Sequence, residues 1–315
     1  MVNLGERSAE EVGGGVYLID LELEGYKGFG AAYLLVDDKK MLVETGPAAS
    51  HEKLLETLRG LDIKPEDLDY IALTHIHLDH GGGVGHLAKR AEKVKIFVHE
   101  AGVQHLINPS RLWASAKEVL GETVKELGKP LSVPPGMILP AHHGLGLRLG
   151  KKFEVKIHQT RGHAPHHIAL FEENNRILFP GDEAGARFLG CVVPATPAPN
   201  FNFNQTLKSI ERFIALRPKA ICFSHFGTVE DPNVLKTYRG QLELWREIIA
   251  GFTGGKKIDR DRILEEILEK DAEVKRLTSL LVEKKTLPMN LIRRILVVNI
   301  DGFIRYLTER QDPYC

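Results

Sequence analysis

The chain has 315 residues, which suffices for two domains or for one large domain with an appendage. Hydrophobic residues make up 43% and charged residues 27%, values that exclude a wholly disordered chain and collagen-like repeats. The 42 Lys and Arg balance 42 Asp and Glu, so no net positive charge attracts nucleic acid or an anionic membrane.

The cysteines and the two ends of the chain indicate the cellular compartment in which the protein is expected. Three widely spaced cysteines are too few for a disulfide framework. Residues 1–11 are polar and lack an apolar signal core, and charges interrupt the apolar stretch 291–307. We therefore expect a cytoplasmic protein that does not bind membranes.

Residues 1–230 read as two successive β-rich halves, each with helices after its strands. In chain order, the first half predicts strands at 16–23, 32–36, 41–44, 71–73 and 94–98, and helices at 51–60, 86–91 and 110–128. The second half predicts strands at 147–149, 153–157, 167–171, 176–179 and 220–223, and a helix at 204–216. This order favours an α/β fold in which two sheets pack face to face with helices outside.

The character of the sequence changes after residue 230. Four helices are predicted there, at 231–250, 259–270, 271–285 and 289–309. We therefore expect an α/β domain at 1–230 and a helical region at 231–315. The last helix carries an apolar stripe that must be buried, either against the chain's own core or in a homodimer: Leu291, Ile292, Ile295, Leu296, Asn299, Phe303 and Leu307.

Four potential metal ligands lie within six residues, directly after the strand predicted at 71–73. They are His75, His77, Asp79 and His80, and three glycines follow them. A strand-to-loop transition lets side chains point towards one open edge, and glycines let the backbone crowd a small site. The segment therefore predicts a metal site.

Three more residues of the same chemical types follow strands farther along the chain. His163 comes after the strand at 153–157, Asp182 after that at 176–179, and His225 after that at 220–223. Strands that repeat this arrangement could place all seven side chains along one edge of a sandwich.

Together the seven residues resemble the motifs of the metallo-β-lactamase superfamily over roughly residues 15–228. Residues 75–80 match its HxHxDH motif, and the other three follow in the family's order. The resemblance implies a four-layer αββα sandwich, here with a C-terminal helical extension, and a two-metal site on its edge. By that resemblance one metal binds His75, His77 and His163, the second binds Asp79, His80 and His225, and Asp182 bridges the two.

The chemistry of these residues agrees with such a site. Imidazole and carboxylate ligands suit two divalent transition-metal ions, with zinc favoured over iron and manganese. A hydroxide shared by two cations can act as the nucleophile, so no covalent intermediate is expected. Ser224 precedes His225 at a strand end, where neighbouring side chains alternate, so it should face away from the metals. The candidate catalytic residues are Asp79, Asp182 and His166, the last as a donor to a developing oxyanion or leaving group.

The sequence leaves two functions open. The first is hydrolysis of small esters, lactones, thioesters or phosphoesters, and the sequence is similar here to glyoxalase II-like and lactonase-like enzymes. The alternative is a nuclease or nucleic-acid processing enzyme of the ribonuclease Z-like type. Residues 183–203 should form a stiff loop with little regular structure, in which Phe201 and Phe203 either line a pocket or pack on the helical tail.

Overall fold

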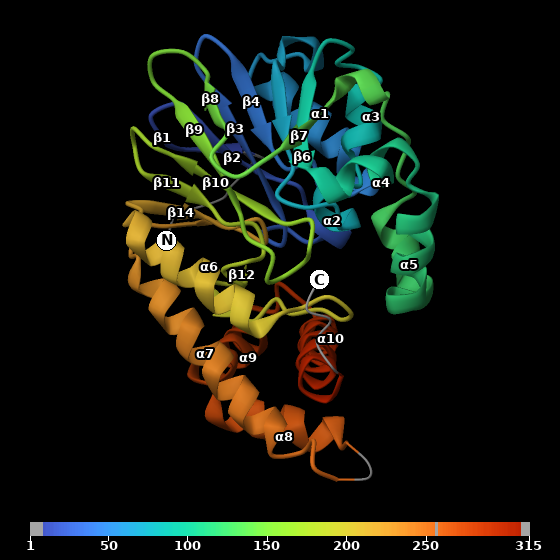
Figure 1. Ribbon diagram of the computed structural model, residues 1–315, viewed down its shortest axis with the longest axis vertical. Coiled ribbons are helices and arrows are strands. Elements are labelled where there is room, and N and C mark those ends of the chain that lie inside the picture. Colours follow the sequence, from blue (N-terminus) through green and yellow to red (C-terminus); the bar gives the residue numbers. More distant parts are fainter. Residues whose placement is uncertain (1–8, 256–257, 310–315) are drawn as a thin grey trace.

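The computed structural model describes residues 9–255 and 258–309. Two β-sheets pack against each other with helices on their outer sides, and further helices lie beneath the sandwich (Figure 1). The expected αββα sandwich with a C-terminal helical extension is therefore confirmed. Most of the N-terminal segment 1–11, on which the expected location rests, lies outside the described residues.

The first sheet has seven strands in sequential order. The pairs from β1 to β4 are antiparallel and those from β4 to β7 are parallel. Its strands are β1 (Ala9–Gly13), β2 (Val16–Asp20), β3 (Ala31–Val36), β4 (Lys40–Val43), β5 (Tyr70–Ala72), β6 (Lys95–His99) and β7 (Ile138–Ala141). Parallel strands end at the same edge of a sheet, so β4 and β5 both deliver the residues that follow them to one edge.

The second sheet has six strands in the order β15-β14-β11-β10-β9-β8. They are β8 (Gly146–Arg148), β9 (Glu154–Gln159), β10 (Ile168–Glu172), β11 (Ile177–Phe179), β14 (Ala220–Cys222) and β15 (Thr228–Val229). Only β11 and β14 are parallel among these pairs, and the segments that follow both strands therefore leave the sheet at the same edge.

Strand alternation explains the layers. In β3, Tyr33 and Leu35 face the core between the sheets, whereas Ala32 and Leu34 face the helices outside the first sheet. The outer helices on that side are α1 (His51–Gly60), α3 (Val84–Ala88) and α4 (Val103–Ile107), whereas α2 (Leu78–Gly81) and α5 (Ser110–Leu120) also contact the core that continues into the helical tail. The second sheet is covered by α6 (Phe203–Leu216), and its outer core continues into the helical tail.

Two predicted elements were wrong. The single helix predicted at 110–128 ends at Leu120, because Gly121 adopts a positive φ of 62° and a 3₁₀ segment, Gly121–Leu127, follows. The loop predicted at 183–203 contains a hairpin of β12 (Ala186–Phe188) and β13 (Cys191–Val193). Its turn, Leu189–Gly190, has positive φ at both residues, a geometry that fits the twist of paired strands.

The tail consists of α7 (Asn233–Ala250), α8 (Arg260–Lys270), α9 (Ala272–Lys284) and α10 (Met289–Thr308). The apolar stripe of α10 is buried within the chain, where Leu291, Leu296 and Phe303 join the core cluster that also includes β10 and β13. Phe201 packs on Phe303 with ring centroids 4.8 Å apart, so Phe201 and Phe203 contact the tail. A homodimer and the domain boundary near residue 230 stay predictions.

None of the helices within residues 9–255 and 258–309 is long and apolar enough to cross a membrane.

The segment after β13 holds α10 close to the sandwich. The Thr196 backbone N–H donates to Asn299 Oδ1 at 2.5 Å, and the Thr196 hydroxyl donates to the Asn299 carbonyl at 3.0 Å. One turn later, a Cβ at Gly302 would overlap the Thr196 carbonyl oxygen. The two segments can therefore approach this closely only because residue 302 is a glycine.

We predict that Gly302→Ala lowers the free energy of unfolding by about 1–3 kcal/mol, because the added methyl must push α10 away from Thr196. Gly240 in α7 is the matched control, since a Cβ there meets nothing within 4 Å. Gly240→Ala should raise the same free energy by up to about 1 kcal/mol, since alanine favours a helix interior. Urea denaturation of both variants tests this; a Gly302→Ala protein as stable as Gly240→Ala would contradict it.

Candidate metal centre

Residues that follow strands of both sheets meet at one edge of the sandwich. The 75–80 segment follows β5 of the first sheet, whereas the His163, Asp182 and His225 positions follow β9, β11 and β14 of the second. The side chains expected from the sequence therefore come together, although they are spread over 150 residues of chain.

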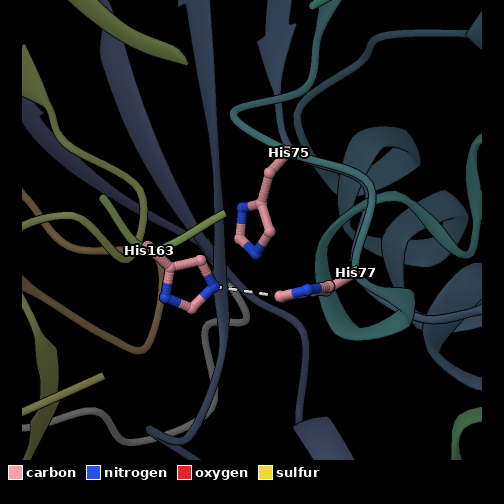
Figure 2. Close-up of side chains that lie close together, drawn as sticks. All are labelled: His75, His77 and His163. Atoms are coloured by element: carbon pink, nitrogen blue, oxygen red, sulfur yellow. Dashed lines mark hydrogen bonds between the residues drawn. The ribbon is translucent and has the colours of Figure 1, made fainter. Parts of the chain in front are cut away.

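Three imidazoles form the first cluster: His75, His77 and His163 (Figure 2). One ring nitrogen from each lies within 4.8 Å of those of the other two. His163 Nε2 is 3.1 Å from His77 Nδ1, and the His75 ring lies 4.5 Å from that of His77 between centroids.

Asp79, His80 and His225 form the second cluster, again with ligand atoms within 4.8 Å of one another. Asp182 lies between the clusters. Its carboxylate oxygens are 3.4 Å from His80 Nε2, 3.5 Å from His225 Nε2 and 3.7 Å from His163 Nε2. The position of Asp182 thus suits a carboxylate shared by two cations.

The distances from Asp182 to the histidine rings fit metal ligands better than hydrogen-bond partners. Separations of 3.4–3.7 Å exceed normal N–H···O distances. Ligand atoms at about 2.0–2.2 Å from a tetrahedral zinc ion lie about 3.3–3.6 Å from one another. His75 Nε2, His80 Nε2 and Asp182 Oδ1 are buried without a hydrogen-bond partner among the described residues, and a bound cation would compensate all three.

Proton positions also favour metal binding. Burial lowers the pKa of His75 well below its usual value, and it lowers that of His77 to about 3, so both rings are neutral. Burial would also lower the pKa of His80, but the carboxylates of Asp182, Asp79 and Glu44 raise it above the usual range. This concentration of negative charge around a buried imidazole favours a proton or, in its place, a metal cation.

Hydrogen bonds behind the clusters fix which ring nitrogen faces inward. The Thr74 hydroxyl donates to Glu44 Oε1, so its oxygen accepts from His75 Nδ1 at 3.0 Å. His80 Nδ1 donates to the same carboxylate at 3.3 Å. Both rings therefore turn Nε2 towards the site, and this nitrogen binds a metal once it carries no proton.

Glu44 is a functional residue that the sequence analysis missed. It follows β4, is 1% exposed and accepts hydrogen bonds from Thr74, His80 and Ser224. The only local signal was its place directly after the apolar strand β4, two residues before Gly46. Ser224 donates to this carboxylate at 3.3 Å.

A second buried acid, Glu183, supports the His163 loop. Its carboxylate accepts the backbone N–H groups of Gly162 and His163 at 3.1 and 2.8 Å, and burial raises its pKa to about 8. His163 Nδ1 then donates to the Ala195 carbonyl at 2.8 Å, which leaves Nε2 free to face the site. His167 accepts the Asp182 N–H at 3.3 Å, a supporting role.

A cavity of about 510 Å³ opens onto the metal centre. His166, the other candidate catalytic residue, lines it, and its ring lies 5.4 Å from that of His77 between centroids. Burial lowers the pKa of His166 well below its usual value, so its neutral ring can donate one hydrogen bond into the cavity. His105 also lines the cavity.

Comparisons with known proteins agree with this geometry. ST1585 of Sulfurisphaera tokodaii, a metallo-β-lactamase fold-containing protein, is 31% identical over 213 residues, which cover 66% of this chain and 77% of the relative. Its crystal structure matches with a TM-score of 0.67 at 23% identity, over 92% of this chain and 98% of that chain. A match over 92% of this chain cannot lie within residues 1–230 alone, so the similarity in fold extends into the helical tail.

Two other relatives match more weakly. MJ0888 of Methanocaldococcus jannaschii, named a probable metallo-hydrolase, is 28% identical over 170 residues, or 54% of this chain and 74% of the relative. The exodeoxyribonuclease WalJ of Streptococcus pneumoniae is 47% identical over only 58 residues, or 18% of this chain and 21% of the relative. Residues 25–225 match the sequence model of the metallo-β-lactamase superfamily, and with the strand-end cluster in place the chain belongs to that superfamily.

Proposed function

We propose that the protein is a metal-dependent hydrolase of small molecules that carry an ester, lactone, thioester or phosphoester bond. The observation that carries this proposal is two ligand clusters with Asp182 between them, opening onto one cavity. Two divalent cations, with zinc favoured over iron and manganese, would supply Lewis acidity that polarises a carbonyl or phosphoryl oxygen and acidifies water. The relative named as a probable metallo-hydrolase supports the reaction class.

Each residue has a distinct part in this proposal. His75, His77 and His163 would hold one cation, and Asp79, His80 and His225 the other. Asp182 would hold both in place, since it contacts the two clusters. His166 would donate a hydrogen bond to a substrate oxygen, because it lines the cavity beside His77 and its Nδ1 has no partner among the described residues.

The surroundings of the site favour a small substrate over a nucleic acid. Arg293 pairs with Asp261 at 2.8 Å, and Arg294 pairs with Glu24 at 2.8 Å, so neither arginine offers an uncompensated charge to phosphates. The match to WalJ spans only 58 residues, so the sequence similarity between the two proteins is limited to a short segment. We therefore propose a small-molecule substrate.

The reaction class is tested with a panel of chromogenic esters, lactones, thioesters and phosphoesters, on protein stripped of metal and on protein reloaded with zinc, iron or manganese. We expect activity only after reloading. A single turnover in ¹⁸O-water should place one solvent oxygen in the product. Absence of hydrolysis across the whole panel with two metals bound, or a trapped acyl- or phosphoryl-enzyme, would overturn the proposal.

We predict that Asp182→Ala loses at least one of about two metal ions per chain, because it removes a carboxylate placed against both clusters. Inductively coupled plasma mass spectrometry gives the metal content directly. Asp38→Ala, in the exposed turn between β3 and β4, is the control and should keep both ions. An Asp182→Ala protein that also keeps both would remove Asp182 from the site.

Glu44→Gln should weaken metal affinity by about 10–100-fold, because the amide cannot accept from Thr74, His80 and Ser224 together as the carboxylate does. Competition with a chromogenic chelator measures the affinity. Ser224→Ala removes only one of these donors and should keep both the metal and most of the activity. Loss of activity in a metal-loaded Ser224→Ala protein would indicate that this hydroxyl acts in the reaction.

A further inference from the structure

We infer that the substrate carries a linear apolar chain, which lies in the cavity beside the metal centre while the hydrolysed bond reaches the ligands. This inference rests on the proposed hydrolysis and names the class of substrate. The cavity volume of about 510 Å³ lies well within the range of small-molecule sites. Nothing in the metal centre itself requires so large a space.

The interior walls of the cavity are mostly apolar and come from several parts of the chain, four of which are named here. Leu23 and Phe29 lie on the N-terminal side, and Phe188 comes from β12. α5 contributes Leu112, Ala116 and Leu120, and α10 contributes Ile295 and Val298. Figure 1 shows α5 at the edge of the molecule and α10 beneath the sandwich. A polar or highly charged substrate would lose its hydration against such walls without compensation.

Three polar residues of the wall, Glu24, Arg294 and Asn299, already make hydrogen bonds within the protein. Arg294 Nη2 donates to both Glu24 oxygens, at 2.8 and 3.1 Å, so the two charges cancel. The Asn299 amide accepts from the Thr196 N–H and donates to the Ile295 carbonyl. These side chains close the wall, and they leave little capacity to bind polar groups of a ligand.

Other polar lining residues lie at the mouth instead. Arg111, Ser115 and Asn200 line the cavity and are exposed to solvent. α5 itself has no buried residue, and Val119 on it is 51% exposed. An apolar interior, a polar rim and a metal centre at one wall together fit a chain that is apolar along its length and polar only at the bond to be cleaved.

The test uses the metal-loaded protein with two ester series. One series lengthens the acyl chain from two to twelve carbons on a p-nitrophenol leaving group, and the other lengthens the alcohol on acetate. In the series that matches the chain, kcat/KM should rise by up to about fourfold per added methylene until the cavity is full. The series that responds shows on which side of the bond the chain lies. A flat or falling profile in both series, in a protein that hydrolyses the shortest ester, would overturn the inference.

Ala116→Phe should end this rise at a shorter chain, because its side chain fills the cavity from α5. Ala114→Phe is the matched control, since it lies on the exposed side of the same helix and outside the cavity lining. The control should keep the wild-type profile. Equal profiles for Ala116→Phe and the wild type would contradict the placement of the chain between α5 and α10.

Binding provides a readout that does not depend on catalysis. Calorimetric titration of decanoate into metal-free protein should show binding that Ala116→Phe weakens at least tenfold and Ala114→Phe leaves unchanged. If no ester is hydrolysed but this pattern appears, the proposed reaction fails and the apolar-chain cavity stands. If esters are hydrolysed but decanoate does not bind, the reaction stands and the cavity inference fails.

Discussion

Two buried acids, Glu44 and Asp182, organise this site, because polar groups cannot be buried without partners. Glu44 meets that requirement with hydrogen bonds from behind the site, from Thr74, His80 and Ser224. These bonds orient the imidazoles of His75 and His80 from the side away from the cavity. Asp182 keeps one oxygen without a hydrogen-bond partner among the described residues, and that oxygen is available to a cation. The arrangement of strands and helices brings both acids to one edge.

The metal centre was predictable because its residues follow short apolar strands, and both the residue types and the strands can be recognised locally. His75 and His225 are distant in sequence, but each sits at the end of a strand that periodicity identifies. Most strands and all tail helices were located by the same periodicity. Glu44 and Glu183 were missed because an acid becomes informative only when tertiary packing buries it and supplies its donors.

The errors also have local physical causes. Gly121 ends α5 early through a backbone conformation that glycine adopts readily, but helix periodicity alone did not indicate the break. The β12–β13 hairpin turns through Leu189–Gly190, which lacks the Asn-Gly or Asp-Gly pattern that marks such turns most clearly. Whether Phe201 and Phe203 line a pocket or pack on the tail depends on where α10 lies, and only tertiary structure decides this.

The glycine at 302 has a consequence for how this enzyme class can diversify. It lets α10 lie against Thr196, so one wall of the cavity comes from residues 294–299, whereas every candidate metal ligand precedes residue 226. Part of the proposed substrate cavity is thus encoded apart from the candidate metal ligands, although Leu23, Phe29, Phe188 and α5 line it from the same stretch of the gene as those ligands. Mutation or exchange of the distal stretch can change which molecules fit while the reactive groups stay intact. New specificities are therefore accessible by evolution, or in the laboratory, without rebuilding the catalyst.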